Sequence, residues 1–366
     1  MQMKKIIQTL LLLAGIAMIL PIQAYAGRPQ LYQERLEVGR ALLEVQIANV
    51  DEVLPHYAED IEYHDPIVDI YGIEDMTDFL YQLLGAGNLL TVIEDETLIG
   101  NTYSATWTMS GDFIGVPYEA KGISIFKFRR KSSMVYYQRD YYSEGDIMAT
   151  IQSPGQSIPG LDEVIWGFRS YYRCAVDPTF ECPFGEPPST SESRIGFEAP
   201  DNPPALLKRN NRLRSPEQLR RVQLEVGRQL VEINAGNWKD VLPHLASNYE
   251  YHDPIVDIYG PDTMAEFLGR LFAGSSELYT TVEEETLVDG VYMATWTMSG
   301  MFNGAPFSAP GMSIVKFIDG TLQSYYSRDY YTEGDVMLGV TELAPAVMGF
   351  RVYYSCAVDP TFECPF

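Results

Sequence analysis

The decapeptide YHDPIVDIYG occupies residues 63–72 and returns unchanged at residues 251–260. Three other segments also occur twice: ATWTMSG at 105–111 and 294–300, RDYY at 139–142 and 328–331, and CAVDPTFECPF at 174–184 and 356–366. The copies differ in length only at turns, which indicates that each copy is a folded unit. A repeat of roughly 150 residues is a domain rather than a solenoid unit, so we predict two tandem globular domains.

The domain boundaries follow from composition. We predict a leader at residues 1–26, a first domain at 27–184, a linker rich in Pro, Ser and Arg at 185–215, and a second domain at 216–366. The linker has no apolar periodicity, which is typical of an extended connection. Each domain ends in a tail that carries two cysteines.

The first 26 residues have the pattern of a secretory signal peptide. Two lysines precede an apolar run at residues 10–20, and the small residues Ala24 and Ala26 suit a signal peptidase. We expect cleavage after Ala26. An uncleaved membrane anchor is the alternative, but the apolar run is short for a span of about 20 residues. The predicted location is therefore secreted or periplasmic, with no membrane contact after cleavage.

The chain is strongly acidic, with 26 Lys and Arg against 50 Asp and Glu. Cleavage would remove two lysines and no acids, which leaves 24 basic residues and a net charge of −26. This charge disfavours nucleic acid and anionic membranes as partners. One dense basic cluster, at residues 208–221, is the exception. We expect a solvated stretch there, with a processing site or a ligand contact as the alternatives.

Two cysteines stand at equivalent positions in each repeat, which suits an oxidising compartment. Each pair encloses an Asp-Pro turn that would bring the sulfurs together. Of the three possible connectivities, we predict Cys174 with Cys182 and Cys356 with Cys364. A redox or metal-binding pair is the alternative, but the CxxC spacing that it needs is absent.

Each repeat is predicted to begin with helices and to end with strands, which is an α+β order. In the first repeat, helical periodicity covers residues 31–47, 53–57 and 76–84. Strand patterns cover residues 63–70, 90–98, 103–113, 118–128 and 134–142. Pro66 interrupts the first of these strands, so we expect it at an edge or entering a loop.

Alternation along two strands places acidic side chains on defined faces. Tyr63 and Asp65 share one face, and Gln138, Asp140 and Tyr142 share another. If the sheet curves around the helices, burial raises the pKa of a carboxyl on the inner face towards that of a usable acid or base. The alternatives are a turn-capping role for Asp65 and an ion pair at a sheet edge for Asp140.

These motifs, in this order, resemble the SnoaL-like branch of the NTF2-like superfamily. The matching stretches are INAG at 233–236, YHDP at 251–254, TWTMSG at 106–111, GVP at 115–117, and the closing RDYY. The likeness covers roughly residues 31–142 and 219–331. It implies an α+β fold of two tandem cones, each with three helices packed on a strongly curved antiparallel sheet around a pocket. The family includes polyketide cyclases, a steroid isomerase, an epoxide hydrolase and non-catalytic binding domains, so the fold alone assigns no activity.

The resemblance also relates individual positions to the family's functional residues. The general base of the isomerase corresponds to Asp65 and Asp253, its oxyanion-hole tyrosine to Ala41 and Gln229, and its acid donor lies near Ser124 and Ser313. The tyrosine of the epoxide hydrolase corresponds to Tyr63 and Tyr251, and its final-strand aspartate to Asp140 and Asp329. Its Arg-x-Asp pair falls on Trp107 and Met109, and on Trp296 and Met298. Both donors of the isomerase are thus replaced.

The remaining residues fit proton transfer next to a carbonyl group in a small apolar molecule, as in isomerisation or aldol-type cyclisation. The candidate catalytic residues are Asp65, Asp140, Asp253 and Asp329. The candidate ligand-binding residues are Tyr63, Trp107, Met109, Gln138, Tyr142, Tyr251, Trp296, Met298 and Tyr331. A non-catalytic binding or assembly module is the alternative, which the 25 tyrosines also suit.

We expect no cofactor, because nucleotide-binding motifs are absent from the sequence. A metal site built from His64, Asp65 and Asp69 is disfavoured, because strand alternation directs His64 away from Asp65. The resemblance further implies that the two repeats pair through their sheets as an internal pseudo-dimer.

Overall fold

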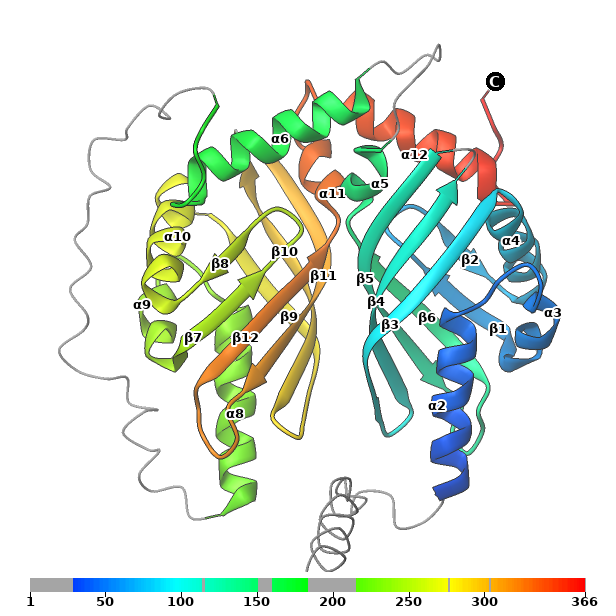
Figure 1. Cartoon of the computed structure of the whole chain (residues 1–366), viewed down its shortest axis with the longest axis horizontal. Helices are drawn as coiled ribbons and strands as arrows, with labels where there is room; N and C mark the ends of the chain where they lie inside the picture. Colours follow the sequence, from blue (N-terminus) through cyan, green and yellow to red (C-terminus); the bar gives the residue numbers. More distant parts are fainter. Residues whose placement is uncertain are drawn as a thin grey trace, which may run out of the picture.

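The computed structural model describes residues 29–113, 116–150, 160–183, 215–275, 277–302 and 304–365. The predicted leader lies outside the described residues, as do residues 184–214, which contain nearly all of the predicted linker. The described chain forms two copies of one α+β domain (Figure 1), which confirms the predicted fold. No helix among the described residues is long and apolar enough to cross a membrane.

The first domain contains α2 (Pro29–Leu43), α3 (Val50–Val53), η2 (Leu54–His56), β1 (Tyr57–His64), β2 (Asp69–Tyr71), α4 (Ile73–Gly85), β3 (Gly87–Ile99), β4 (Thr102–Phe113), β5 (Val116–Phe128), β6 (Val135–Tyr142), α5 (Glu144–Met148) and α6 (Leu161–Val176). The second contains α8 (Pro216–Val231), α9 (Trp238–Val241), η3 (Leu242–His244), β7 (Leu245–His252), β8 (Asp257–Tyr259), α10 (Pro261–Gly274), β9 (Tyr279–Val288), β10 (Val291–Phe302), β11 (Ala305–Phe317), β12 (Ser324–Tyr331), α11 (Glu333–Leu338) and α12 (Ala344–Val358).

The first helix is shorter than its predicted range. It ends at Leu43, and Ile47 lies beyond it with 53% of its surface exposed. The prediction that this helix extends to Ile47 was therefore wrong. The single predicted strand around Pro66 is a hairpin instead, since β1 begins at Tyr57 and β2 runs back beside it at the sheet edge. Asp65 accepts hydrogen bonds from the amides of Ile67 and Val68, which closes this turn.

Each sheet is mixed rather than wholly antiparallel. The strand order is β2-β1-β6-β5-β4-β3 in the first domain and β8-β7-β12-β11-β10-β9 in the second. All neighbours are antiparallel except β1 with β6 and β7 with β12. A close approach on the concave face depends on Gly122, because an added Cβ would lie 2.3 Å from the Trp107 ring. The Trp107 indole therefore lies across β5 and forms part of the inner wall.

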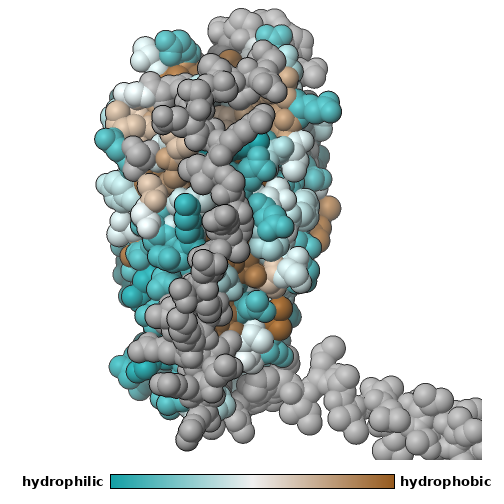
Figure 2. All heavy atoms as spheres, turned by 90° about the vertical axis from the view of Figure 1, so that its left-hand side faces the viewer, coloured by the Kyte–Doolittle hydropathy of each residue, from teal (hydrophilic) through white to brown (hydrophobic). Residues whose placement is uncertain are grey.

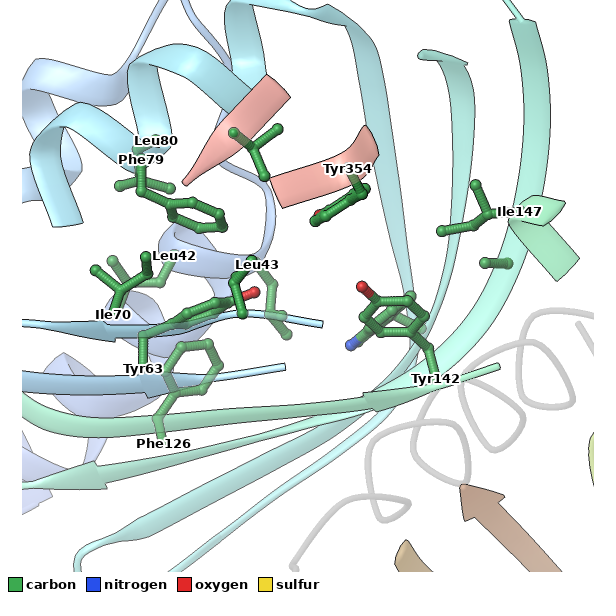
Figure 3. Close-up of a cluster of buried hydrophobic side chains, with 14 of the residues drawn as sticks. Leu42, Leu43, Tyr63, Ile70, Phe79, Leu80, Phe126, Tyr142, Ile147 and Tyr354 are labelled. Carbon is green, nitrogen blue, oxygen red and sulfur yellow. The ribbon is translucent and has the colours of Figure 1, made fainter. Parts of the chain in front are cut away.

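The core of each domain lies between the concave face of the sheet and its helices. In the first domain, Leu42 from α2 and Phe79 from α4 are almost wholly buried, together with Phe126 from β5. Figure 3 shows these side chains around Tyr63. The outer surface of the second domain over α8 to α10 is mainly hydrophilic (Figure 2). Burial of apolar area on one side of each element accounts for this layering.

The outer faces of the two sheets contact each other. Ile123, Ile125 and Tyr141 of the first domain form an apolar cluster with side chains of the second, namely Met293, Met312, Ile314 and Tyr330. Two ion pairs flank the cluster, Lys127 with Glu284 at 2.8 Å and Lys316 with Asp95 at 2.8 Å.

The last helix of each repeat packs on the other repeat. Helix α6 contacts α10 of the second domain, and α12 contacts α4 of the first, as Figure 1 shows at the top of the molecule. We call α6 and α12 the exchanged helices. Each carries one Arg that reaches a fully buried Glu across the boundary: Arg169 to Glu333 at 2.9 Å and Arg351 to Glu144 at 2.6 Å.

One disulfide in each repeat joins the C-terminal part of the exchanged helix to the tail that follows it. They link Cys174 with Cys182 and Cys356 with Cys364, which is the predicted pairing. There are no free cysteines among the described residues. Each tail is thereby linked to a helix that packs on the neighbouring domain.

Candidate functional site

Each domain encloses a cavity between its concave sheet and its helices, of about 90 Å³ in the first domain and about 140 Å³ in the second. The structure brings all of the predicted catalytic and ligand-binding residues to these walls. In the first cavity they are Tyr63, Asp65, Trp107, Met109, Gln138, Asp140 and Tyr142. In the second they are Tyr251, Asp253, Trp296, Met298, Asp329 and Tyr331.

Asp65 uses its two carboxylate oxygens differently. Oδ1 accepts hydrogen bonds from the backbone amides of Ile67 at 2.6 Å and Val68 at 2.7 Å, so it holds the turn after β1. Oδ2 accepts from the hydroxyls of Tyr63 at 3.2 Å and Tyr142 at 3.3 Å. The turn-capping alternative thus describes one oxygen, while the other belongs to the polar group of the cavity.

Asp140 stands on β6, in the interior of the sheet. Its Oδ2 accepts from the Tyr63 hydroxyl at 3.2 Å, and both of its oxygens lie 3.3 Å from Nε2 of Gln138. Ser124 also hydrogen-bonds to Asp140 and is itself held by Nε1 of Trp107 at 2.8 Å. No Arg or Lys of the described chain offsets the burial of this carboxyl, so the alternative of an ion pair at a sheet edge does not describe Asp140.

The second domain repeats this arrangement. Tyr251 donates to Oδ2 of Asp329 at 2.9 Å and lies 3.3 Å from Oδ2 of Asp253. Ser313 donates to Oδ1 of Asp329 at 2.5 Å, and Nε1 of Trp296 donates to Ser313 at 2.7 Å. A tyrosine hydroxyl has one proton, so it donates to one of its two carboxyl neighbours at a time.

Burial raises the pKa of all four aspartates. The pKa of Asp65 rises to about 7 and that of Asp140 to about 6, with desolvation as the largest cause in both and the charge of Asp140 acting further on Asp65. Asp253 and Asp329 show the same values, about 7 and about 6. Burial also raises the pKa of Tyr63 well above its usual value, so this hydroxyl stays protonated.

Each exchanged helix supplies a tyrosine to a cavity, and the sequence did not predict either of them. Tyr354 of α12 lines the cavity of the first domain and hydrogen-bonds to Tyr142 (Figure 3). Tyr172 of α6 lines the cavity of the second domain. The apolar spacing of Leu161, Ile165 and Phe168 would have indicated a helix, but not the domain on which it packs.

The outer side of β1 carries a separate polar contact. Nδ1 of His64 lies 2.5 Å from Oδ1 of Asp69, and the same pair recurs as His252 with Asp257. Among the described residues, no group of three or more His, Cys, Asp or Glu side chains is placed to hold a metal ion.

Each repeat has a curved sheet, covering helices and a cavity with paired carboxyls, an arrangement typical of a ligand-binding or catalytic domain. Residues 40–136 and 226–325 match the SnoaL-like domain family and make up more than half of the chain. The chain belongs to this family, as its motifs indicated. No curated protein matches the chain in sequence.

Several solved structures are similar to single domains of this chain. One is a protein with a ketosteroid isomerase-like fold from Catenulispora acidiphila, in complex with trimethylamine, at 15% identity over 32% of this chain and 90% of that one, with a TM-score of 0.29. An epoxide hydrolase of M. tuberculosis is 17% identical over 31% and 86%, with a TM-score of 0.29. The Δ5-3-ketosteroid isomerase of Mycobacterium sp. is 15% identical over 31% and 95%, with a TM-score of 0.28.

Proposed function

We propose that each domain binds a small, mainly apolar carbonyl compound and catalyses proton transfer at the carbon next to the carbonyl group. The reaction would be a double-bond isomerisation or an aldol-type cyclisation. One observation carries this proposal: in both copies, two desolvated carboxyls share a single tyrosine hydroxyl inside a cavity. Apolar walls with a few convergent polar groups and raised pKa values are typical of an active site.

The protonation state of the pair suits acid–base chemistry. With pKa values of about 7 for Asp65 and about 6 for Asp140, the two carboxyls together hold about one proton between pH 6 and 7. We assign this proton to the coupled pair rather than to either residue. The ionised member would remove a proton from the substrate, and the protonated member would donate a hydrogen bond to the developing oxyanion.

The proton balance closes within the site. The proton taken from the α-carbon resides on the first carboxyl and returns to the substrate at another carbon, or to the newly formed alkoxide in a cyclisation. The Tyr63 hydroxyl lies within hydrogen-bond distance of both carboxyls and donates to one of them. We therefore propose that Tyr63 links the two acids.

The two repeats act in this proposal as an internal pseudo-dimer. The contacts between the outer sheet faces support it, and so does the contribution of Tyr354 and Tyr172 to the cavity of the other repeat. We also propose a secreted or periplasmic location. The two disulfides are compatible with an oxidising compartment.

A non-catalytic binding domain is the second candidate. It is favoured by the hydrogen bonds from Ile67 and Val68 to Oδ1 of Asp65, because they give this residue a structural role that requires no chemistry. In that case the cavity holds its ligand and leaves it unchanged.

Exchange of α-hydrogens with solvent distinguishes the two candidates. Cyclohexanone in D₂O serves as the probe, and NMR follows deuterium incorporation next to its carbonyl group. We expect the protein to accelerate exchange and the D65N/D253N double variant to lose at least about a hundredfold of this rate while it still binds the ketone. Asn keeps an oxygen for the two backbone amides, so the turn should survive.

The matched control is D69N/D257N, which changes two exposed acids of the same decapeptide. This variant should exchange like the parent protein. Ketone binding without any acceleration over buffer would reject the catalytic proposal and leave the binding domain.

A further inference from the structure

The two cavities contain equivalent pairs of aspartates but differ in the wall beside them. In the first domain, the Tyr57 hydroxyl donates to Oε1 of Gln138 at 2.7 Å, and Nε2 of Gln138 lies 3.3 Å from Asp140. The equivalent positions in the second domain hold Leu245 and Ser327. The second domain also has Tyr249 where the first has Ile61, so its wall carries a tyrosine and a short hydroxyl in place of a tyrosine and an amide.

The hydroxyl of Ser327 has only one weak partner. Ser327 is 5% exposed and lines the second cavity, where its side chain interacts with that of Tyr249. The Ser327 Oγ makes no hydrogen bond of normal geometry with any residue of the described chain. Buried polar groups in native proteins are nearly always paired, so a hydroxyl that faces a cavity without such a bond indicates a partner supplied by a ligand.

The second cavity is also the larger, at about 140 Å³ against about 90 Å³. The smaller side chain of Ser327 contributes to this difference, as does Val315, which stands where the first domain has the fully buried Phe126. An apolar cavity of about 150 Å³ takes up a molecule the size of benzene. A six-membered ring therefore suits the second cavity and is too large for the first.

The position of Ser327 sets a distance within the ligand. Ser327 and Asp329 lie on the same face of β12, two residues apart, which is about 7 Å along a strand. A ring with one oxygen at the acids and a second oxygen on the opposite side of the ring would span this distance and satisfy both ends.

We propose that the two cones of this chain bind different ligands, and that the wall residues at positions 57, 61, 126 and 138 in the first cone, and 245, 249, 315 and 327 in the second, determine the difference. The second cone takes a six-membered ring with a carbonyl at the acids and a hydroxyl or second carbonyl at Ser327. The first cone takes a smaller carbonyl compound with one polar group. This inference rests on the proposed function, because it requires that the cones bind carbonyl compounds.

The test compares two probes that differ by one hydroxyl, cyclohexanone and 4-hydroxycyclohexanone, in NMR titrations of the full-length protein. We expect one molecule of 4-hydroxycyclohexanone to bind per chain. S327A should weaken its binding about fivefold to tenfold and leave the affinity for cyclohexanone unchanged, because only the hydroxylated probe loses a hydrogen bond. The matched control, S308A at an exposed position of β11 outside the cavity, should change neither affinity.

A transplanted wall gives an independent readout. L245Y/Y249I/V315F/S327Q rebuilds the first-domain wall in the second cone and should abolish ring binding, while Y57L/I61Y/F126V/Q138S should create a second ring-binding site per chain. Unchanged thermal unfolding would show that both variants fold. Equal binding of the hydroxylated ring by S327A and the parent, or two equal sites in the parent, would overturn the inference while the proposed function stands. Failure of the parent to bind either ketone would reject both.

Discussion

Arg351, near the end of the chain, donates to the fully buried carboxylate of Glu144 with Nη2 2.6 Å from Oε1, across 207 positions of sequence. Thr332 donates to the same oxygen at 2.8 Å. Gly334 makes this contact possible, because an added Cβ there would lie 1.4 Å from the carboxylate. The pair fixes α12 on the first domain and so holds Tyr354 in the cavity of that domain.

Removal of this arginine should destabilise the protein strongly. R351M leaves the Glu144 carboxylate buried without its cation, and we expect a loss of about 3 to 5 kcal/mol in the free energy of unfolding at pH 7, measured with urea. The double variant E144Q/R351M should recover part of the loss, since it removes the buried charge as well. A single variant as stable as the parent would show that α12 is not held by this pair.

The pocket acids should lower stability at neutral pH. The pKa of Asp140 is raised to about 6 in the folded protein, so between its unfolded pKa of about 4 and pH 6 the folded state binds more protons, and stability falls as the pH rises. We expect D140N to raise the free energy of unfolding by about 1 to 3 kcal/mol at pH 8 and to change it little at pH 4. Urea unfolding at both pH values measures this. Destabilisation by D140N at pH 8 would contradict a desolvated carboxylate.

His244 should make the second domain sensitive to acid. It is fully buried, and burial lowers its pKa. The unfolded chain takes up a proton below pH 6.5 that the folded ring resists, so stability should fall with decreasing pH by up to about 1.4 kcal/mol per pH unit. H244L should remove this dependence between pH 5 and 7. H56L, at the equivalent and partly exposed position of the first repeat, is the matched control and should keep it.

The exchanged helices should act on the domain they contact rather than on their own. With acetone as the exchange probe, which both cones can hold, only the first cone retains both acids in a D253N background, and Y354F should lower α-hydrogen exchange about tenfold because Tyr142 loses a hydrogen-bond partner beside Asp65. Y172F should have no effect there. In a D65N background, Y172F should lower the exchange rate and Y354F should have no effect. The same response in both backgrounds would exclude the assignment of each tyrosine to the opposite cone.

Strand alternation was sufficient to predict most of the site. It placed Asp65 with Tyr63 and Asp140 with Tyr142, and all four lie on the cavity wall, because side chains two residues apart must share a face of the sheet. The identical segments identified the second set of residues without further information. The α+β fold and the disulfide pairing also followed from repeats and spacing.

The rest of the site depends on contacts between segments far apart in sequence. The sequence does not show that α12 crosses to the first domain, because its apolar side chains would suit either domain. The parallel pairing of β1 with β6 depends on tertiary packing in the same way. In the sequence, Ser124 and Ser313 were noted only because they stand near the position of the isomerase's acid donor. In the structure, their hydrogen bonds with Trp107 and Trp296 link the cavity wall to the acids.

The ionisation of the four cavity carboxyls decides whether each cone contains a desolvated acid pair. NMR of the protein labelled with ¹³C at the aspartate side-chain carboxyls follows their titration between pH 3 and 9. We expect four carboxyls that titrate at about pH 6 to 7, two of which disappear in D65N/D140N and two in D253N/D329N. Titration of every aspartate near its ordinary pKa of about 4 would contradict a desolvated acid pair in either cone.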